Sequence, residues 1–420
     1  MTPAGADRRR FLASAAAVGV RGVPAETAAR AETASRCESD VLVCGGGPSG
    51  MAAAANAARQ GARVILLERW GRLGGMAVSG LVGPLMGGVK SPLVEEVMRR
   101  TSAPKVDPNL LDIEHAEIVR EAGVRILLHT WVTGVRMDGS RILLVQAISK
   151  PGGTEFQAGV FVDASGDGDV AFRAGADWEM GRKGGGREAV RLMAGGRSWR
   201  DIGREANRNG EIPPDAGIVR TDATDRPGEV IVNAARSNGV SGISAEDLTR
   251  AELDGRRPAG RILKFLRRRA PGYEKARISL MPAAVGVRET RRIVGEKHLQ
   301  REHLVAGRRW DDAVVWDARF PIDIHNPAGV GQAGGRFAEE VKPYQSPYGR
   351  LVPKKKIGNL LTAGRCISGS HEAHASYRVQ KIAMAIGAAA GAAAGVAARK
   401  GRDLREIDAA AVQRFLLRDS

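Results

Sequence analysis

The chain is poor in cysteine. Its 420 residues include three, Cys37, Cys44 and Cys366, and no two of them have C-x-x-C spacing. An ordinary iron–sulfur cluster needs four thiolates, and a redox disulfide needs a cysteine pair, so the sequence excludes both within this chain. Any redox chemistry here must therefore use an organic cofactor.

Aromatic residues are also scarce, at 4% of the chain. The formal charge of +17 could suggest nucleic acid or an anionic membrane as a partner. Recognition of unpaired bases, however, depends on stacking against aromatic side chains. The densest basic run after the N-terminus, residues 261–269 (RILKFLRRR), has helical spacing and a single aromatic. We therefore predict a solvated helix face there and no nucleic-acid partner.

Part of the basic excess precedes residue 40. Residues 7–20 (DRRRFLASAAAVGV) place a basic cluster before a short apolar run, and residues 29–31 (ARA) supply an A-x-A site. Residues 8–12 resemble a twin-arginine motif. We predict that residues 1–37 are a twin-arginine signal for periplasmic or extracellular export. The alternative is a disordered basic extension on a cytoplasmic protein.

Glycine, in contrast, is abundant. The chain contains 54 glycines, which is about twice the usual share of about 7%. Residues 41–50 (VLVCGGGPSG) combine a predicted buried strand, 41–44, with a glycine loop and the start of a helix. Gly45, Gly47 and Gly50 satisfy G-x-G-x-x-G. These glycines respectively allow a tight turn, close approach of a pyrophosphate, and close packing of helix on strand, so the loop predicts a dinucleotide site.

The residues that follow agree with this interpretation. A second strand is predicted at 63–67, and Glu68 stands at its end, near the spacing of about 20 expected for a carboxylate that binds ribose hydroxyls. Residues 71–76 (GRLGGM) then add a second glycine turn, which suits an extended dinucleotide. The alternative is a βαβ unit with a glycine-rich turn and no ligand.

Four stretches carry a resemblance to a known family: residues 74–87, 160–176, 285–296 and 359–379. With the glycine loop, they resemble FAD-dependent oxidoreductases of the glutathione-reductase fold type, related to fumarate-reductase flavoproteins and to the flavoprotein component of heterodisulfide reductase. The resemblance implies FAD as the cofactor. The residues that it implies for FAD binding are Gly45, Gly47, Pro48, Ser49, Gly50, Glu68, Arg69, Gly74, Gly75, Met76, Asp163, Gly166, Gly364 and Arg365.

The resemblance also implies an α/β fold with a discontinuous, Rossmann-type FAD-binding domain built on a parallel sheet. We expect residues 38–175 to form its first part and residues 351–400 its second part. Residues 176–350 would be an inserted α+β substrate domain, and residues 401–420 a C-terminal helix. A homodimer is compatible with this fold class.

The stretch 382–398 is apolar throughout, but alanine and glycine insert poorly into membranes. Gly387, Gly391 and Gly395 recur every four positions. We predict a helix buried in the protein and packed closely on the glycine-loop unit, and no membrane span.

The polar residues that precede this helix are the best candidates for catalysis. We predict that His371 or His374 is a general acid/base and that Arg378 binds a substrate carboxylate or a flavin carbonyl. The alternative is that they only hydrogen-bond the cofactor and the loop backbone. The spacing H-E-x-H lacks a third ligand, so no metal site is predicted.

Two further segments contribute weaker candidates. Arg288, Arg291 and Arg292 lie in a predicted helix, where Arg288 could bind a substrate anion and two of the three would face solvent. His325 resembles a segment near the entrance of the family's substrate domain. The sequence also departs from the family, since residues 88–92 shorten a glycine-rich passage and Gln380 replaces a proline-containing helix start.

These features predict an FAD-dependent oxidoreductase that transfers a hydride between FAD and an unidentified small organic substrate, with an unidentified electron donor or acceptor. One alternative is an FAD-binding electron-transfer or assembly protein without its own catalysis. Another is an RNA-modifying flavoprotein, which the basic balance favours and the scarcity of aromatics opposes.

Overall fold

The structure is a computed structural model that describes residues 35–82, 85–101, 107–181, 190–192, 196–198, 209–211, 220–223, 227–233, 235–237, 239–324 and 339–418. Arg36–Ser420 is one compact unit. The predicted twin-arginine motif at residues 8–12 and His325 lie outside the described residues, so export and a role for His325 stay predictions, as does the division into domains.

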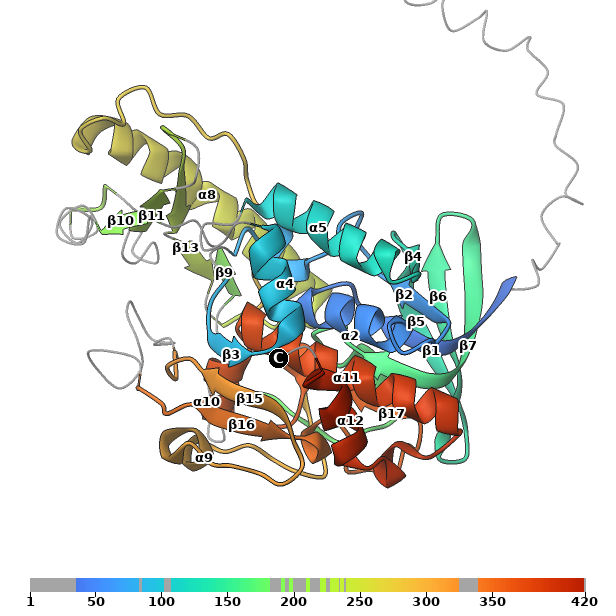
Figure 1. Ribbon diagram of the computed structural model, residues 1–420. Coiled ribbons are helices and arrows are strands. Elements are labelled where there is room, and N and C mark those ends of the chain that lie inside the picture. Colours follow the sequence, from blue (N-terminus) through green and yellow to red (C-terminus); the bar gives the residue numbers. More distant parts are fainter. Residues whose placement is uncertain are drawn as a thin grey trace, which may run out of the picture. The chain divides into compact units, whose positions relative to one another are not determined.

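Figure 1 shows the fold coloured along the sequence, with many of its elements labelled. The strands are β1 (Ser35–Cys44), β2 (Val64–Leu67), β3 (Gly88–Lys90), β4 (Arg125–Leu127), β5 (Trp131–Asp138), β6 (Arg141–Ser149), β7 (Gly152–Asp163), β8 (Trp178–Glu179), β9 (Val190–Leu192), β10 (Gly196–Ser198), β11 (Arg220–Ala223), β12 (Val230–Asn233), β13 (Ala235–Ser237), β14 (Arg292–Ile293), β15 (Ala313–Arg319), β16 (Tyr344–Pro347) and β17 (Leu360–Thr362). The helices are α2 (Pro48–Ala58), α3 (Gly75–Val78), α4 (Pro92–Arg100), α5 (Pro108–Glu121), α6 (Asp169–Arg173), α8 (Ala245–Arg269), α9 (Arg301–Ala306), η2 (Tyr348–Arg350), η3 (Gly364–Cys366), α10 (His371–Tyr377), α11 (Gln380–Lys400), η4 (Leu404–Glu406) and α12 (Ala409–Leu416).

The main sheet has the strand order β4-β2-β1-β7-β6-β5, and β17 also pairs with β7. Strand β2 is parallel to both β1 and β4. The first half of β7 pairs antiparallel with β6, whereas its last three residues pair in parallel with β17. Strand β7 therefore leaves a hairpin and enters a largely parallel sheet, which a segment some 200 positions later completes. The predicted α/β fold with a parallel, discontinuous sheet is confirmed.

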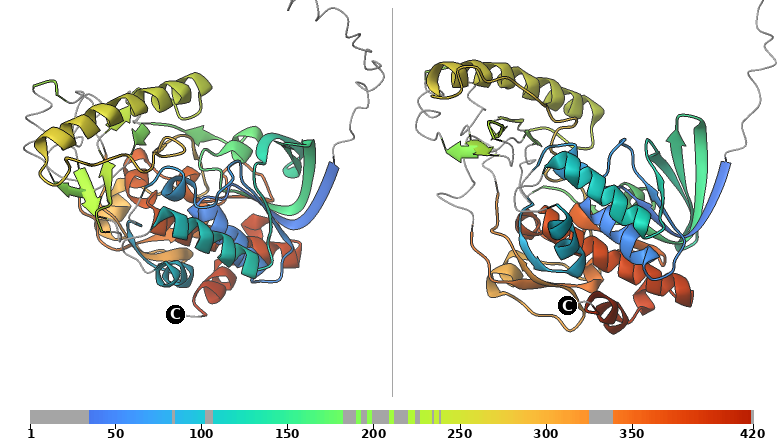
Figure 2. Two further views of the ribbon diagram at one scale, coloured as in Figure 1. Left: turned by 90° about the horizontal axis from the view of Figure 1, so that it is seen from above. Right: turned by 45° about the horizontal axis from the view of Figure 1, so that its top comes forward.

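Strand β1 separates two hydrophobic cores. Val41 and Val43 face a core that contains residues of α2, α5 and α11, while Leu42 and Cys44 face a second core with Phe156 of β7. Successive side chains of a strand point to opposite faces, so a strand covered on both faces is apolar at every position. Figure 2 gives two further views of the fold. They show the layer of helices and, beside it, the hairpin that continues the sheet.

By length and composition, helix α11 could cross a membrane. However, 89% of its apolar stretch is buried inside the protein. A Cβ atom added at Gly387 would lie 2.0 Å from the Ser49 carbonyl oxygen, and one at Gly391 would lie 2.1 Å from that of Ala53. The glycine repeat thus lets α11 contact the backbone of α2, as predicted.

One local prediction was wrong. Residues 288–291 have no regular secondary structure rather than forming a helix, and Arg292 begins β14, which pairs antiparallel with β8. Arg288, Arg291 and Arg292 are 5%, 8% and 3% exposed, so none of the three faces solvent. The C-terminal region also differs slightly from a single helix, because the short turn η4 precedes α12.

The contact between α2 and α11 predicts the effect of one methyl group. We expect Gly391→Ala to destabilise the fold by about 1–3 kcal/mol, because the new Cβ would overlap the backbone of α2. The measurement is the shift of the thermal unfolding midpoint. Gly260→Ala in α8 is the control, since a Cβ there meets no atom within 4 Å. Equal midpoints for the two variants would contradict the proposed packing.

Candidate functional site

A cleft opens at the edge of the sheet where β1, β2 and β7 end. It encloses about 1200 Å³, including its open mouth. Ligands of open parallel sheets bind at this edge, outside the carboxyl ends of the strands. The lining residues are Gly45, Gly47, Pro48, Ser49, Glu68, Arg69, Trp70, Gly75, Met76, Ala77, Val82, Met86, Ala164, Ser165, Gly166, Gly286, Val287, Arg288, Phe320, Asp323, Arg365, Arg378, Val379, Gln380 and Ala383.

The glycine loop forms one wall of this cleft, and its glycines serve different purposes. A Cβ on Gly45 would lie 2.4 Å from the Ala164 carbonyl oxygen, and one on Gly50 would lie 1.6 Å from the carbonyl oxygen of Gly45. Both are therefore required by the packing of the protein itself. A Cβ on Gly47 would meet only the Gly75 Cα, at 3.9 Å, which is an ordinary contact. The missing side chain at Gly47 thus leaves space in the cleft rather than relieving a clash.

That space lies at the start of α2. Pro48 occupies the first turn, no side chain caps the helix, and no acidic residue lies in its first turn. The helix dipole and the backbone N–H groups at this end favour a bound anion. The loop therefore fits the pyrophosphate of a dinucleotide.

Glu68 lines the cleft at the end of β2 and is 5% exposed. Its Oε2 accepts a hydrogen bond from the Gly46 amide at 2.6 Å, and its Oε1 accepts one from the Trp70 amide at 2.9 Å. Burial raises the pKa of this carboxyl above its usual value. Glu68 thus joins the glycine loop to the segment after β2, and its predicted contact with a ribose stays a prediction.

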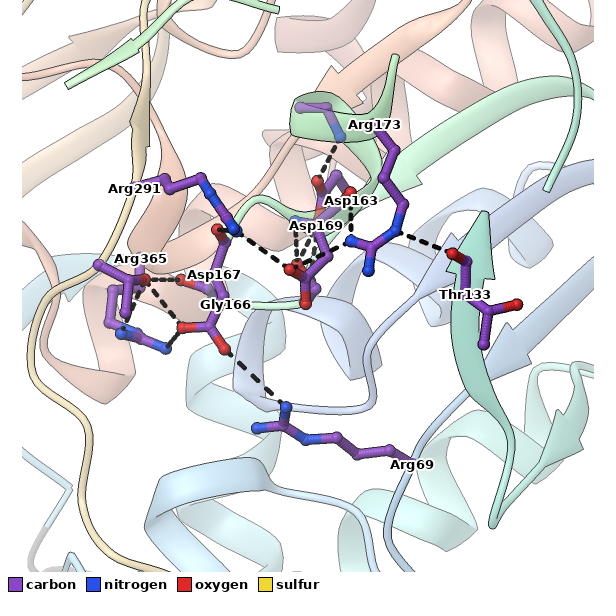
Figure 3. A network of polar contacts seen from close by, with 12 residues as sticks. Arg69, Thr133, Asp163, Gly166, Asp167, Asp169, Arg173, Arg291 and Arg365 are labelled. Carbon is purple, nitrogen blue, oxygen red and sulfur yellow. Dashed lines mark hydrogen bonds and ion pairs between the residues drawn. The ribbon is translucent and has the colours of Figure 1, made fainter. Parts of the chain in front are cut away.

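Asp167 connects two cationic side chains that line the cleft (Figure 3). Its Oδ1 accepts a hydrogen bond from Arg365 Nη2 at 2.7 Å, and its Oδ2 lies 3.9 Å from Arg69 Nη1. Thr290 donates to the same Oδ1 at 2.8 Å. Gly166 has a φ of +79°, and a Cβ there would lie 2.9 Å from Arg365 Nη2. One carboxylate therefore holds Arg69 and Arg365 at the cleft.

Four of the residues that the resemblance implies for FAD binding do not line the cleft but shape its walls. Besides Gly50, these are Asp163, Gly74 and Gly364. Asp163 is fully buried and accepts hydrogen bonds from Ser165 and from the Ala171 amide, which holds the turn after β7. Gly74 and Gly364 have φ values of +93° and +77°, in the left-handed region that favours glycine.

A second group of charges in the cleft consists of Arg288, Asp323 and Arg378, here called the arginine–aspartate cluster. Arg288 Nη2 donates to the Asp323 carbonyl oxygen at 2.7 Å and to its Oδ2 at 3.1 Å. Arg378 Nη2 donates to the same Oδ2 at 3.3 Å. Phe320 and Val287 line the cleft with them. The structure thus brings together Arg288 and Arg378, which lie in two different candidate segments of the sequence.

The two candidate histidines lie behind this wall rather than in its lining. His371 is 5% exposed, and its Nδ1 lies 2.7 Å from Glu289 Oε2. His374 is 1% exposed, and its Nε2 has no hydrogen-bond partner within the described part of the chain. Burial, followed by nearby arginines, lowers the pKa of His374 well below its usual value, so this ring is neutral.

Sequence reasoning missed Glu289 and Asp323. Glu289 contacts both His371 and Arg292, and its Oε1 also accepts a hydrogen bond from the Gly181 amide at 3.2 Å. The available signal for Glu289 was an acidic residue among the closely spaced Arg288, Arg291 and Arg292. Among the described residues, no group of three or more His, Cys, Asp or Glu side chains is arranged to hold a metal ion.

Comparisons with known proteins identify the family. A family model described as FAD dependent oxidoreductase matches residues 40–416. Among solved structures, the chain is similar to a geranylgeranyl bacteriochlorophyll reductase-like protein of Thermoplasma acidophilum, with 12% identity, 90% of this chain and 82% of that chain covered, and a TM-score of 0.47. It is also similar to the flavin-dependent brominase Bmp2, with 13% identity, 91% and 83% coverage, and a TM-score of 0.42. None of the curated proteins compared with the chain matches it.

The space at Gly47 yields a test of dinucleotide binding. We expect Gly47→Ala to keep the fold but to lower the amount of dinucleotide that co-purifies at least tenfold, because the methyl group would occupy the space left for the phosphates. The measurement is the ratio of released dinucleotide to protein after acid precipitation. Gly153→Ala, where a Cβ meets no atom within 4 Å, is the control. Full dinucleotide content in Gly47→Ala would refute this role of the loop.

A buried histidine beside the second glycine turn predicts a pH dependence. His115 is 0% exposed, and burial lowers its pKa from 6.5 to about 4. Between these values the unfolded chain binds a proton that the folded protein does not, so stability falls as the pH drops from 6.5 toward 4, by roughly 3 kcal/mol in total. His115→Leu should reduce the pH dependence of the unfolding midpoint over this range. An unchanged pH profile would show that His115 is not the group responsible.

Proposed function

The chain belongs to the FAD dependent oxidoreductase family, and from this premise we propose that the enzyme transfers a hydride between FAD and a small organic substrate. The observation that supports this proposal is a single cleft whose lining includes both the glycine loop and the arginine–aspartate cluster. The glycine loop fits a dinucleotide. The arginine–aspartate cluster combines charge with apolar surface, as binding sites for small molecules do. An electron donor or acceptor, still unidentified, would complete the cycle.

The residues present fit FAD. Gly47 and the first turn of α2 would hold its pyrophosphate, Glu68 its ribose, and Arg365 would lie beside it. When bound, FAD supplies a centre that accepts or donates a hydride. Val379 and Gln380, at the start of α11, line the same cleft.

Helix α11 contributes to the electrostatics of the cleft. It begins without a side-chain cap and without an acidic residue in its first turn. The N-terminus of a helix of 21 residues carries a partial positive charge, which stabilises a negative charge close to that end. The end of the cleft formed by α11 therefore favours an electron-rich, anionic group.

His371 remains our candidate for proton transfer. Its Nδ1 lies within hydrogen-bond distance of Glu289, whose side chain is 2% exposed. A carboxylate that accepts from Nδ1 fixes the tautomer of the ring, as it does for imidazoles that act as bases. His374, buried and neutral, would instead support the loop, and Arg378 would bind the substrate.

The proposal is tested on the purified holoenzyme. We expect the protein to show a flavin absorption spectrum and to release free FAD on acid precipitation. When oxygen is absent, the organic substrate should reduce the bound flavin and so bleach its visible band. His371→Gln should slow this bleaching on the order of 100-fold or more, because a positioned acid/base contributes that much. His303→Gln on α9 is the matched control.

The outcomes separate the alternatives. Bound FAD that no small organic acid, alcohol or amine reduces would favour an electron-transfer or assembly role. Salt-sensitive RNA binding would favour an RNA-modifying flavoprotein. Bleaching of His371→Gln at the rate of the unchanged protein would remove His371 from the proton transfer without affecting the assignment of the cofactor.

A further inference from the structure

Two segments that are far apart in the sequence meet where α11 begins at the cleft. Val82 and Met86, which follow α3, line the cleft together with Val379, Gln380 and Ala383 from the start of α11. Gln380 is 298 positions from Val82. Hydrogen bonds join the two segments, so specific contacts set the position of this part of the lining.

The side chain of Gln380 binds the earlier segment at two points. Its Nε2 donates to the Val82 carbonyl oxygen at 2.5 Å, and its Oε1 accepts a hydrogen bond from the Met86 amide at 3.4 Å. Gln380 is 7% exposed, and a buried amide side chain is stable where both its donor and its acceptor have partners. Gln380 therefore holds the backbone at both Val82 and Met86.

The backbone of α11 adds a third hydrogen bond. The Lys381 amide donates to the Met86 carbonyl oxygen at 3.3 Å, a bond that proline at this position could not make. Gly87 has a φ of +94°, and a Cβ there would lie 2.7 Å from Val379 Cγ2, so the two segments are in close contact. Strand β3 also contacts α11. The two stretches in which the sequence departs from the family thus lie side by side.

Val82 and Met86 present apolar, partly exposed side chains in the lining, and Val287 and Phe320 line the same cleft. A ligand that covers apolar surface gains affinity in proportion to the area that it removes from water. The gain is larger when the surface is already held in place, because no freedom is then lost on binding. Hydrogen bonds that hold Val82 and Met86 therefore contribute to the binding of an apolar ligand.

We propose that Gln380 is a positioning residue that holds Val82 and Met86 as an apolar wall of the cleft, and that this wall selects substrates with an apolar portion. The inference rests on the proposed function, because it assigns a substrate property to the same site. Gln380 acts through Val82 and Met86, whose side chains would contact the substrate. The selection depends on apolar contact and not on the ion pairs elsewhere in the cleft.

The test uses the FAD-loaded protein and three uncharged probes that differ only in chain length: acetamide, butyramide and hexanamide. Binding is followed by ligand-observed NMR, which needs no flavin signal, and the absorption spectrum of the same samples gives the FAD content. Each added pair of methylenes should tighten binding roughly tenfold, because the longer chain covers more of the wall.

Two variants separate the wall from the residue that holds it. Met86→Ala shortens the wall and should reduce the gain per pair of methylenes roughly fourfold, the value of about one buried methylene. Gln380→Met nearly keeps the side-chain volume but removes both hydrogen bonds, and it should reduce the gain by a similar factor. Only Gln380→Met should also speed amide hydrogen exchange at residue 86, by roughly tenfold or more, because this amide loses its acceptor.

Gln413→Met in α12 is the matched control. The side chain of Gln413 also makes two hydrogen bonds to the backbone, to the carbonyl oxygens of Asp311 at 3.0 Å and Ala313 at 2.9 Å, but it does not line the cleft. It should leave the dependence on chain length unchanged. A purely structural role of Gln380 would likewise shift the unfolding midpoint without altering this dependence.

Equal affinity for the three amides, or a dependence on chain length that neither Met86→Ala nor Gln380→Met reduces, would overturn the inference. If Gln380→Met does not fold, an unchanged series in Met86→Ala still overturns it. Protein that binds no FAD would contradict the proposed function, whatever the amide series shows. FAD-loaded protein that a substrate reduces, but in which both variants keep the full dependence on chain length, would contradict the inference alone.

Discussion

The architecture of the site depends on the lack of space around the first turn of α2. A Cβ added at Gly50, Gly364 or Gly387 would lie 2.3 Å or less from the nearest atom of Gly45 or Ser49. These glycines come from three parts of the chain that are more than 300 positions apart at the extremes. Because the chain leaves no room for side chains there, the ends of β1 and β7, the turn η3 and helix α11 all converge on the loop that fits the phosphates.

A second dependence lies in the segment 285–296, where β14 (Arg292–Ile293) is the one strand and which connects the two halves of the cleft. Its side chains contact successive parts of the site: Arg288 contacts Asp323, Glu289 contacts His371, Thr290 contacts Asp167, Arg291 contacts Asp169 and Arg292 contacts the carbonyl of Gly369. Because these residues are not in a helix, five consecutive side chains reach partners in several parts of the site. A helix would have turned some of them toward solvent.

The difference between these two regions explains what the sequence could predict. The glycine loop, the strand with apolar residues at every position and the four-residue glycine repeat of α11 are local patterns, and each has a single physical cause that spacing reveals. The pairs Glu289–His371 and Asp323–Arg378 join residues 82 and 55 positions apart. Neither partner has a local pattern that indicates the other, since their proximity arises only after the sheet has formed. For the same reason the sequence identified Arg378 as a candidate but did not predict its carboxylate partner.

Several of the basic residues are buried in the folded chain. Arg288, Arg291 and Arg292 are nearly buried, and Arg350 is fully buried, where it donates to the carbonyl of Ser368 and to the hydroxyl of Ser346. Part of the excess positive charge therefore lies inside the protein, where it cannot form a surface for nucleic acid. Buried charge is costly unless it is balanced by opposite charge. Besides Asp167 and Asp323, the phosphates of FAD would supply such balance to the arginines that line the cleft, which are Arg69, Arg288, Arg365 and Arg378.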